Sequence, residues 1–115
     1  MEIIEKEWNK LVRDNVCASL EGNGAVVEMR VVRDKKELDC LLRGKLVEES
    51  REVESAQSID EVVEKLADLE TVKQALMRLH GISQGRLTRA RIKKDKLKGT
   101  FGKGHFLIST KERNG

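Results

Sequence analysis

Two long stretches of the chain carry apolar residues at helical spacing, and no proline interrupts either of them. The first stretch runs from Asp34 to about Ser55, and the second runs from Ser58 or Asp60 to His80. Apolar residues that recur every three to four positions share one face of a helix and favour packing along that face. Since 115 residues correspond to one domain, we expect a single all-α domain over residues 1–115, a helical bundle whose two long helices run antiparallel.

Shorter elements flank the two long helices. Asp14 is the expected cap of a helix over roughly residues 15–20, and Ser83 begins a helix that ends near Lys98. Apolar residues alternate over 25–32 and form a short run over 105–109, which predicts two strands and a small two-stranded β element. A bundle this incomplete also predicts self-association, as a homodimer or homotetramer that finishes the core.

Composition excludes several classes of protein. Aromatic residues make up 3% of the chain, which argues against a β-sandwich. No run approaches the roughly 20 apolar residues that a membrane span needs. The N-terminus lacks the charged-then-apolar pattern of a signal peptide. We therefore expect a cytoplasmic protein with no membrane partner.

The net charge of +3 hides an asymmetry along the chain. Residues 84–115 hold ten Lys or Arg and two acidic residues, a net charge of +8, so residues 1–83 carry −5. Such a split is compatible with nucleic-acid binding, with internal pairing, or with a site that handles a metal and a polyanion together. No nucleic-acid motif accompanies the basic helix and stacking aromatics are scarce, so nucleic acid is the least favoured partner.

Acidic side chains project onto the apolar faces of the two long helices. At about 100° per residue, Glu49 lies in the middle of the first apolar face, with Glu48 and Glu52 at its edge, and Asp68 lies at the margin of the second. Carboxylates there are costly unless they are paired or metal-bound. The pattern favours a site for Mg²⁺, or for Mn²⁺ in its place, and the alternative is a solvated acidic surface. The two apolar faces comprise Leu38, Leu41, Leu42, Leu46, Val53 and Ala56, and Ile59, Val62, Leu66, Leu69, Val72, Leu76 and Leu79.

Five segments resemble, in order and spacing, the motifs of one known family. Lys45-Leu-Val-Glu-Glu-Ser-Arg-Glu52 resembles K-L-x-E-E-x-x-E, and Lys65-Leu-Ala-Asp68 lies where that family has E-x-x-D. Asn9-Lys-Leu-Val-Arg-Asp14, Leu79-His-Gly-Ile-Ser83 and the segment from Lys94 to Lys103 resemble its opening, helix-ending and closing motifs. The chain thus resembles MazG-like proteins of the all-α nucleoside triphosphate pyrophosphatase superfamily, in particular their short phosphoribosyl-ATP pyrophosphohydrolase-like branch.

The resemblance implies a Mg²⁺-dependent hydrolase that cleaves a nucleotide between its α- and β-phosphates and releases pyrophosphate, in nucleotide-pool cleaning. It implies Glu49, Glu52 and Asp68 as metal ligands, and Glu48 and Glu49 as the catalytic groups that orient or activate a water. The implied contacts to the substrate's phosphates are Lys10, Arg13, Lys94 and Lys98, for each of which ordinary surface charge is the alternative.

Lys65 departs from the family pattern, which has an acid at this position. The helical projection places Lys65 on the inner side of Asp68, and an ammonium supplies charge but no metal ligand. There it could sit among Glu49, Glu52 and Asp68 and replace a divalent cation by an internal ion pair, or it could turn out to solvent. The family also has an acid near Thr71, and Glu64, four residues before Asp68, is the candidate metal ligand that compensates. Two interpretations stay open: a weakened one-metal site, or a non-catalytic relative that serves as an oligomeric nucleotide-binding or scaffold protein.

Overall fold

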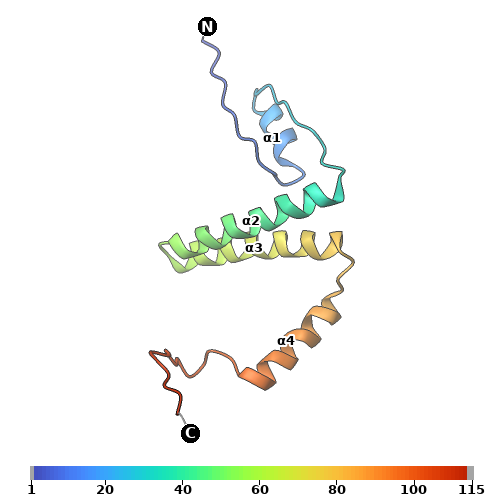
Figure 1. The fold of residues 1–115 in the computed structure, drawn as a ribbon. Helices are drawn as coiled ribbons and strands as arrows, with labels where there is room; N and C mark the ends of the chain where they lie inside the picture. The colour runs from blue at the N-terminus through green and yellow to red at the C-terminus, as the bar shows by residue number, and fades with distance from the viewer. Residues whose placement is uncertain (1, 114–115) are drawn as a thin grey trace. The chain divides into compact units, whose positions relative to one another are not determined.

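The computed structural model describes residues 2–113, where helices are the only regular secondary structure (Figure 1). The helices are α1 (Val16–Gly22), α2 (Lys35–Ser55), α3 (Ile59–Leu79) and α4 (Gln84–Lys98). The chain divides into two compact units, one ending at Gly81 and the other beginning at Ile82. The fold is all-α, as the sequence predicts. None of the helices in the described part of the chain has a stretch long and apolar enough to cross a membrane.

The three longer helices begin where the sequence predicts because a polar side chain caps each of them. Asp34, Ser58 and Ser83 each accept a hydrogen bond from a backbone N–H in the first turn of the helix that follows. These bonds satisfy donors that a helix leaves without an internal partner. At the other end of α3, Gly81 has a φ of +64°, which glycine adopts without steric cost.

The first helix is confirmed, but its predicted cap is wrong. α1 begins at Val16, with Asn15 in the capping position and no hydrogen bond from a capping side chain. Asp14 lies one residue too early to cap it. α1 is also only seven residues long and buries none of its side chains, so it depends on its surroundings rather than on its own stability.

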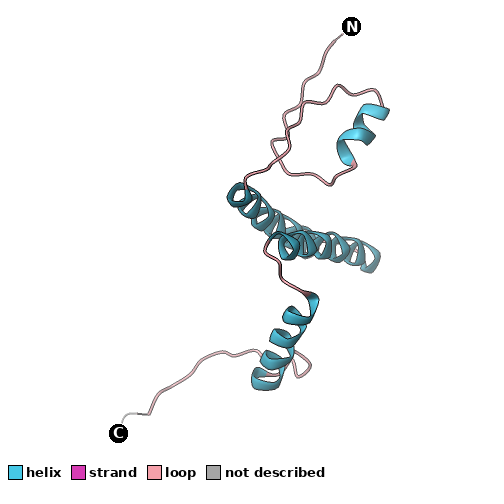
Figure 2. Cartoon of the chain, turned by 90° about the vertical axis from the view of Figure 1, so that its right-hand side faces the viewer, coloured by secondary structure: helices cyan, strands magenta, loops and turns pink. Residues whose placement is uncertain are grey.

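The two predicted strands do not form within residues 2–113, and Figure 2 shows only helices and loops there. Residues 25–32 and 105–109 lack regular structure, and apolar side chains such as Val26 and Leu107 are exposed. A strand needs a neighbour that pairs with its backbone N–H and C=O groups. The two segments belong to different compact units, and neither pairs with another described segment. The expected two-stranded β element is therefore wrong.

The first unit is built on α2 and α3, which lie side by side and antiparallel (Figure 1). Its buried hydrophobic residues are Leu42 from α2, and Val72 and Met77 from α3. Leu42 and Val72 belong to the predicted apolar faces, whereas Met77 does not. Ile59 and Leu66 of the predicted α3 face are exposed, and completion of the core by further copies of the chain stays a prediction.

Polar contacts join the start of α2 to the end of α3. The Asp39 carboxylate is hydrogen-bonded to His80 Nε2, and its other oxygen accepts a hydrogen bond from Arg43 Nε at 2.9 Å. The hydrogen bond with His80, followed by the one from Arg43, holds the pKa of Asp39 below its ordinary value. Because Asp39 and His80 are 41 positions apart in sequence, this contact helps to fix the register of the two helices.

We predict that Val72→Ala lowers the free energy of unfolding by about 2 kcal/mol, because it removes two buried methyl groups and leaves a cavity between α2 and α3. Val72 is 9% exposed, whereas Val31, in the segment before α2, is 61% exposed. The matched control Val31→Ala should change stability by less than about 0.5 kcal/mol. Urea unfolding followed by circular dichroism measures both. Equal losses in the two variants would contradict the packing described here.

Candidate metal centre

Glu49 is a buried acid on the face of α2 that packs against α3. It is 7% exposed, and its Oε2 atom is buried with no hydrogen-bond partner among the described residues. The prediction that Glu49 lies on the apolar face is therefore confirmed. A buried carboxylate oxygen without a partner is unfavourable, because it has lost water and gained nothing in exchange. A bound cation could supply the partner that this oxygen lacks.

Three carboxylates converge at this point. Glu49 and Glu52 lie one turn apart on α2, and Asp68 approaches from α3. One ligand oxygen from each of them lies within 4.8 Å of the other two. Hard divalent cations are bound by carboxylate oxygens, and Mg²⁺ typically uses one or two carboxylates together with water and phosphate oxygens. The predicted ligands Glu49, Glu52 and Asp68 are thus brought together, and their donor set fits Mg²⁺ or Mn²⁺.

Two basic side chains contact the outer members of this carboxylate cluster. Arg13, from the segment before α1, donates a hydrogen bond from Nη2 to Asp68 Oδ1 at 2.7 Å. Lys65, from α3, places its Nζ 3.5 Å from Glu52 Oε2. Both contacts are partly solvated, so each contributes little stability by itself. Arg13 and Lys65 matter to the site because they bring positive charge close to Glu49.

The surroundings of Glu49 and Glu52 on α2 shift their pKa values in opposite directions. Burial is the main cause that raises the pKa of Glu49, and the neighbouring carboxylates of Glu52 and Asp68 raise it further. A hydrogen bond from the Glu49 carboxyl is the main cause that lowers the pKa of Glu52, and the Lys65 ammonium lowers it further. The Glu52 carboxylate in turn raises the pKa of Lys65, which stays charged at neutral pH. Glu49 therefore holds its proton more tightly than Glu52 does.

The remaining predicted site residues lie outside the carboxylate cluster. Glu48 is paired with Lys45, whose Nζ lies 3.3 Å from its carboxylate, and Glu64 is exposed and apart from the three ligands. Lys10 is exposed, with its Nζ 5.1 Å from the centre of the Trp8 ring. Of the two predicted phosphate contacts in the first unit, Arg13 contacts Asp68 of the cluster, whereas Lys10 lies near Trp8. Lys94 and Lys98 belong to the second unit, so their contact with the same substrate stays a prediction.

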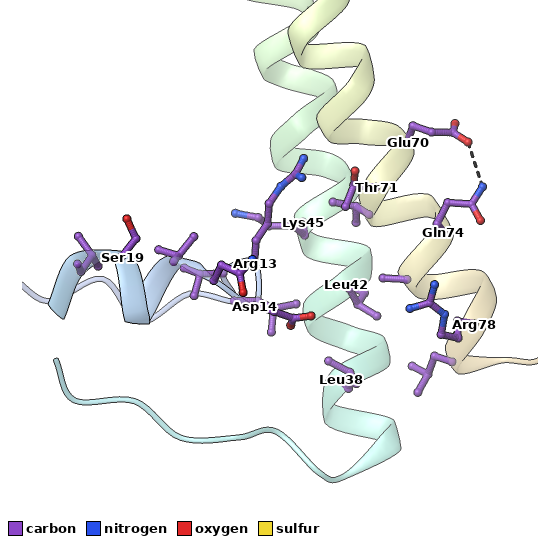
Figure 3. A pocket seen from close by; sticks show the side chains of 18 residues that line it. Arg13, Asp14, Ser19, Leu38, Leu42, Lys45, Glu70, Thr71, Gln74 and Arg78 are labelled. Atoms are coloured by element: carbon purple, nitrogen blue, oxygen red, sulfur yellow. Dashed lines mark hydrogen bonds between the residues drawn. The ribbon is translucent and has the colours of Figure 1, made fainter. Parts of the chain in front are cut away.

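A cavity of about 1070 Å³ lies within the first unit (Figure 3), and none of the three acids of the cluster lines it. Its apolar walls include Leu38 and Leu42 of α2 and Val72 of α3. Arg13 and Lys45 also line it, and these two side chains pair with Asp68 and Glu48 respectively. The cavity is large enough for a small organic ligand, and most of its lining is apolar, as in typical ligand pockets.

Two features of this site escape sequence reasoning. Lys45 is mostly buried and lies close enough to lower the pKa of both Glu49 and Glu52. Its position three residues before Glu48 is a signal that could have revealed the pairing. The contact of Arg13 with Asp68 spans 55 positions, and no local pattern predicts a pairing at that separation.

Comparison of this chain with protein-family models, with curated proteins and with solved structures returned no match. The resemblance to MazG-like proteins therefore stands on the motifs alone. The case for a functional site rests on the geometry of the carboxylate cluster.

We predict that Glu49→Gln stabilises the metal-free protein at pH 7, by roughly 1 kcal/mol. A carboxyl whose pKa is raised on folding favours the folded state most below its unfolded pKa, and this contribution is lost as the pH rises through its folded pKa. Gln carries no charge at any pH, so the advantage of the variant should shrink as the pH falls from neutral through the raised pKa of Glu49 towards its ordinary value of 4.5. Thermal unfolding in a chelator, between pH 4 and pH 8, measures the difference.

Glu54→Gln is the matched control, since Glu54 is exposed on the same helix. It should change stability by less than about 0.5 kcal/mol. Added Mg²⁺ should raise the melting temperature of the parent and of this control, but not that of Glu49→Gln. A parent more stable than Glu49→Gln throughout, without metal, would contradict the assignment of Glu49 as a buried and unsatisfied acid.

Proposed function

We propose that the protein is a Mg²⁺-dependent nucleotide pyrophosphohydrolase, which cleaves between the α- and β-phosphates and releases pyrophosphate. The observation that carries this proposal is the buried, unpartnered oxygen of Glu49, one of the three acids of the carboxylate cluster. Glu49, Glu52 and Asp68 would hold the ion. The motif resemblance supplies the reaction, and the cluster supplies the place where that reaction's metal would bind.

The roles of the side chains follow from their charge and position. A bound Mg²⁺ supplies positive charge for the phosphates and acidifies a coordinated water. Glu48 precedes Glu49 on the helix, lies outside the cluster and pairs with Lys45. In the proposed reaction it would accept a proton from the attacking water or orient that water. Arg13 can exchange its contact with Asp68 for a phosphate oxygen, because a guanidinium binds both kinds of anion through the same donors.

The cavity in the first unit supports a nucleotide as the substrate. Its apolar walls suit a base and ribose, and the basic side chains that line it suit phosphates. Arg13 and Lys45 both line the cavity (Figure 3). Arg13 pairs with Asp68 of the cluster and Lys45 pairs with Glu48, so these two side chains connect the cavity with the acids. We place the nucleoside in the cavity and the phosphates towards Asp68.

A second candidate is favoured by the ion pair between Lys65 and Glu52. In this alternative the ammonium replaces a metal ion, and the protein is a non-catalytic, oligomeric nucleotide-binding or scaffold protein with a degenerate site. Both candidates include assembly into a homodimer or homotetramer. Exposed apolar side chains on the long helices, such as Val47 and Leu66, support that assembly.

We predict that the protein releases pyrophosphate from at least one nucleoside triphosphate or related nucleotide when Mg²⁺ is present, and that chelation abolishes the release. Glu49→Gln should lower kcat/KM by about 100-fold or more, because a metal contributes several kcal/mol to transition-state stabilisation. A coupled pyrophosphate assay across a panel of nucleotides provides the measurement.

Glu54→Gln is again the matched control and should keep the parent's activity, since Glu54 is exposed and outside the cluster. Release of inorganic phosphate in place of pyrophosphate would refute the proposed cleavage position. Absence of pyrophosphate release from every nucleotide tested would favour the non-catalytic candidate.

A further inference from the structure

Lys65 places a positive charge next to the carboxylate cluster. It lies on α3, one turn before Asp68, and its side chain is 30% exposed. Its Nζ is 3.5 Å from Glu52 Oε2, the oxygen on one outer side of the cluster. An ammonium donates hydrogen bonds and has no lone pair to offer, so Lys65 can neutralise a carboxylate but cannot ligate a metal.

The pairing of the outer acids limits how many metal ligands remain. Lys65 contacts Oε2 of Glu52, and Arg13 contacts Oδ1 of Asp68. Each of these two acids keeps its second oxygen, and Glu49 contributes its unpartnered Oε2. The cluster then offers one oxygen from each of three residues, which suits one octahedral ion that completes its shell with water or phosphate.

A pair of metal ions would need more than this. Two-metal phosphoryl sites hold their ions about 3.5–4 Å apart and rely on shared carboxylates. Of the two Glu52 oxygens, Oε2 already faces the Lys65 ammonium, which leaves Glu52 less able to bridge two ions. Charge favours the same count. The three carboxylates with Lys65 and Arg13 carry a net charge of −1, so one divalent ion leaves +1, whereas a second would leave +3 in a partly buried site.

The geometry points to Lys65 as a fixed cation in the place of a second metal ion, so that the cluster binds one divalent ion per chain. This inference rests on the metal site of the proposed function and deepens it. Lys65 acts here as a positioning residue, because it holds Glu52 and supplies charge beside the bound ion without ligating it.

Titration of the full-length chain with Mn²⁺ alone tests the inference, with free Mn²⁺ measured by electron paramagnetic resonance and heat by calorimetry. The parent should bind one ion per chain, and Glu49→Gln should bind none. Lys65→Glu supplies a carboxylate and should raise the stoichiometry to two. Lys65→Gln removes the charge without adding an anionic ligand, so it should still bind one ion, on the order of tenfold more tightly because a repulsion is lost.

The outcomes separate this inference from the proposed function. Two ions per parent chain, or one ion in Lys65→Glu as in the parent, would overturn the role of Lys65 and leave the metal site standing. A parent that binds no Mn²⁺ would overturn the metal site itself. Where Lys65→Glu does not fold, as judged by circular dichroism, an unchanged affinity in Lys65→Gln would show that Lys65 does not lie beside the ion.

Discussion

The packing of α2 against α3 is the contact on which the candidate site depends. Glu49 belongs to one helix and Asp68 to the other, and only the helix pair brings their oxygens within 4.8 Å. Leu42 and Val72 are buried in the same packed pair that removes Glu49 from water. Hydrophobic burial thus holds the helices together and, at the same contact, creates the unsatisfied acid that a cation would satisfy.

The negative charge of the carboxylate cluster is compensated by basic side chains from three different segments of the chain. Arg13 comes from the segment before α1, Lys65 from α3, and Lys45 from α2, where it acts on the cluster through its charge. A buried acid near such partners is tolerated in the fold, although it remains costly where one oxygen has no partner. The positive charges around the cluster explain how this small protein, with few buried apolar side chains, can keep the acid Glu49 between α2 and α3.

Much of the fold follows from local patterns. The start of α2, α3 and α4 is set by Asp34, Ser58 and Ser83, since a cap needs only a short polar side chain beside the first turn. The position of Glu49 follows from helical periodicity. The predicted strands over 25–32 and 105–109 failed because alternation predicts which side chains share a face, but no local pattern supplies the neighbouring strand.

The sequence by itself determined the helices, the caps of α2, α3 and α4, and the placement of Glu49 on an apolar face, because these depend on residues within a few turns of one another. Tertiary structure decided which cation contacts which of those acids. Arg13 reaches Asp68 across 55 positions, and Lys65 pairs with Glu52 of the opposite helix rather than with an acid on its own. The physical reason is that an ion pair depends on distance through space, which the register of α2 against α3 fixes and helical spacing does not.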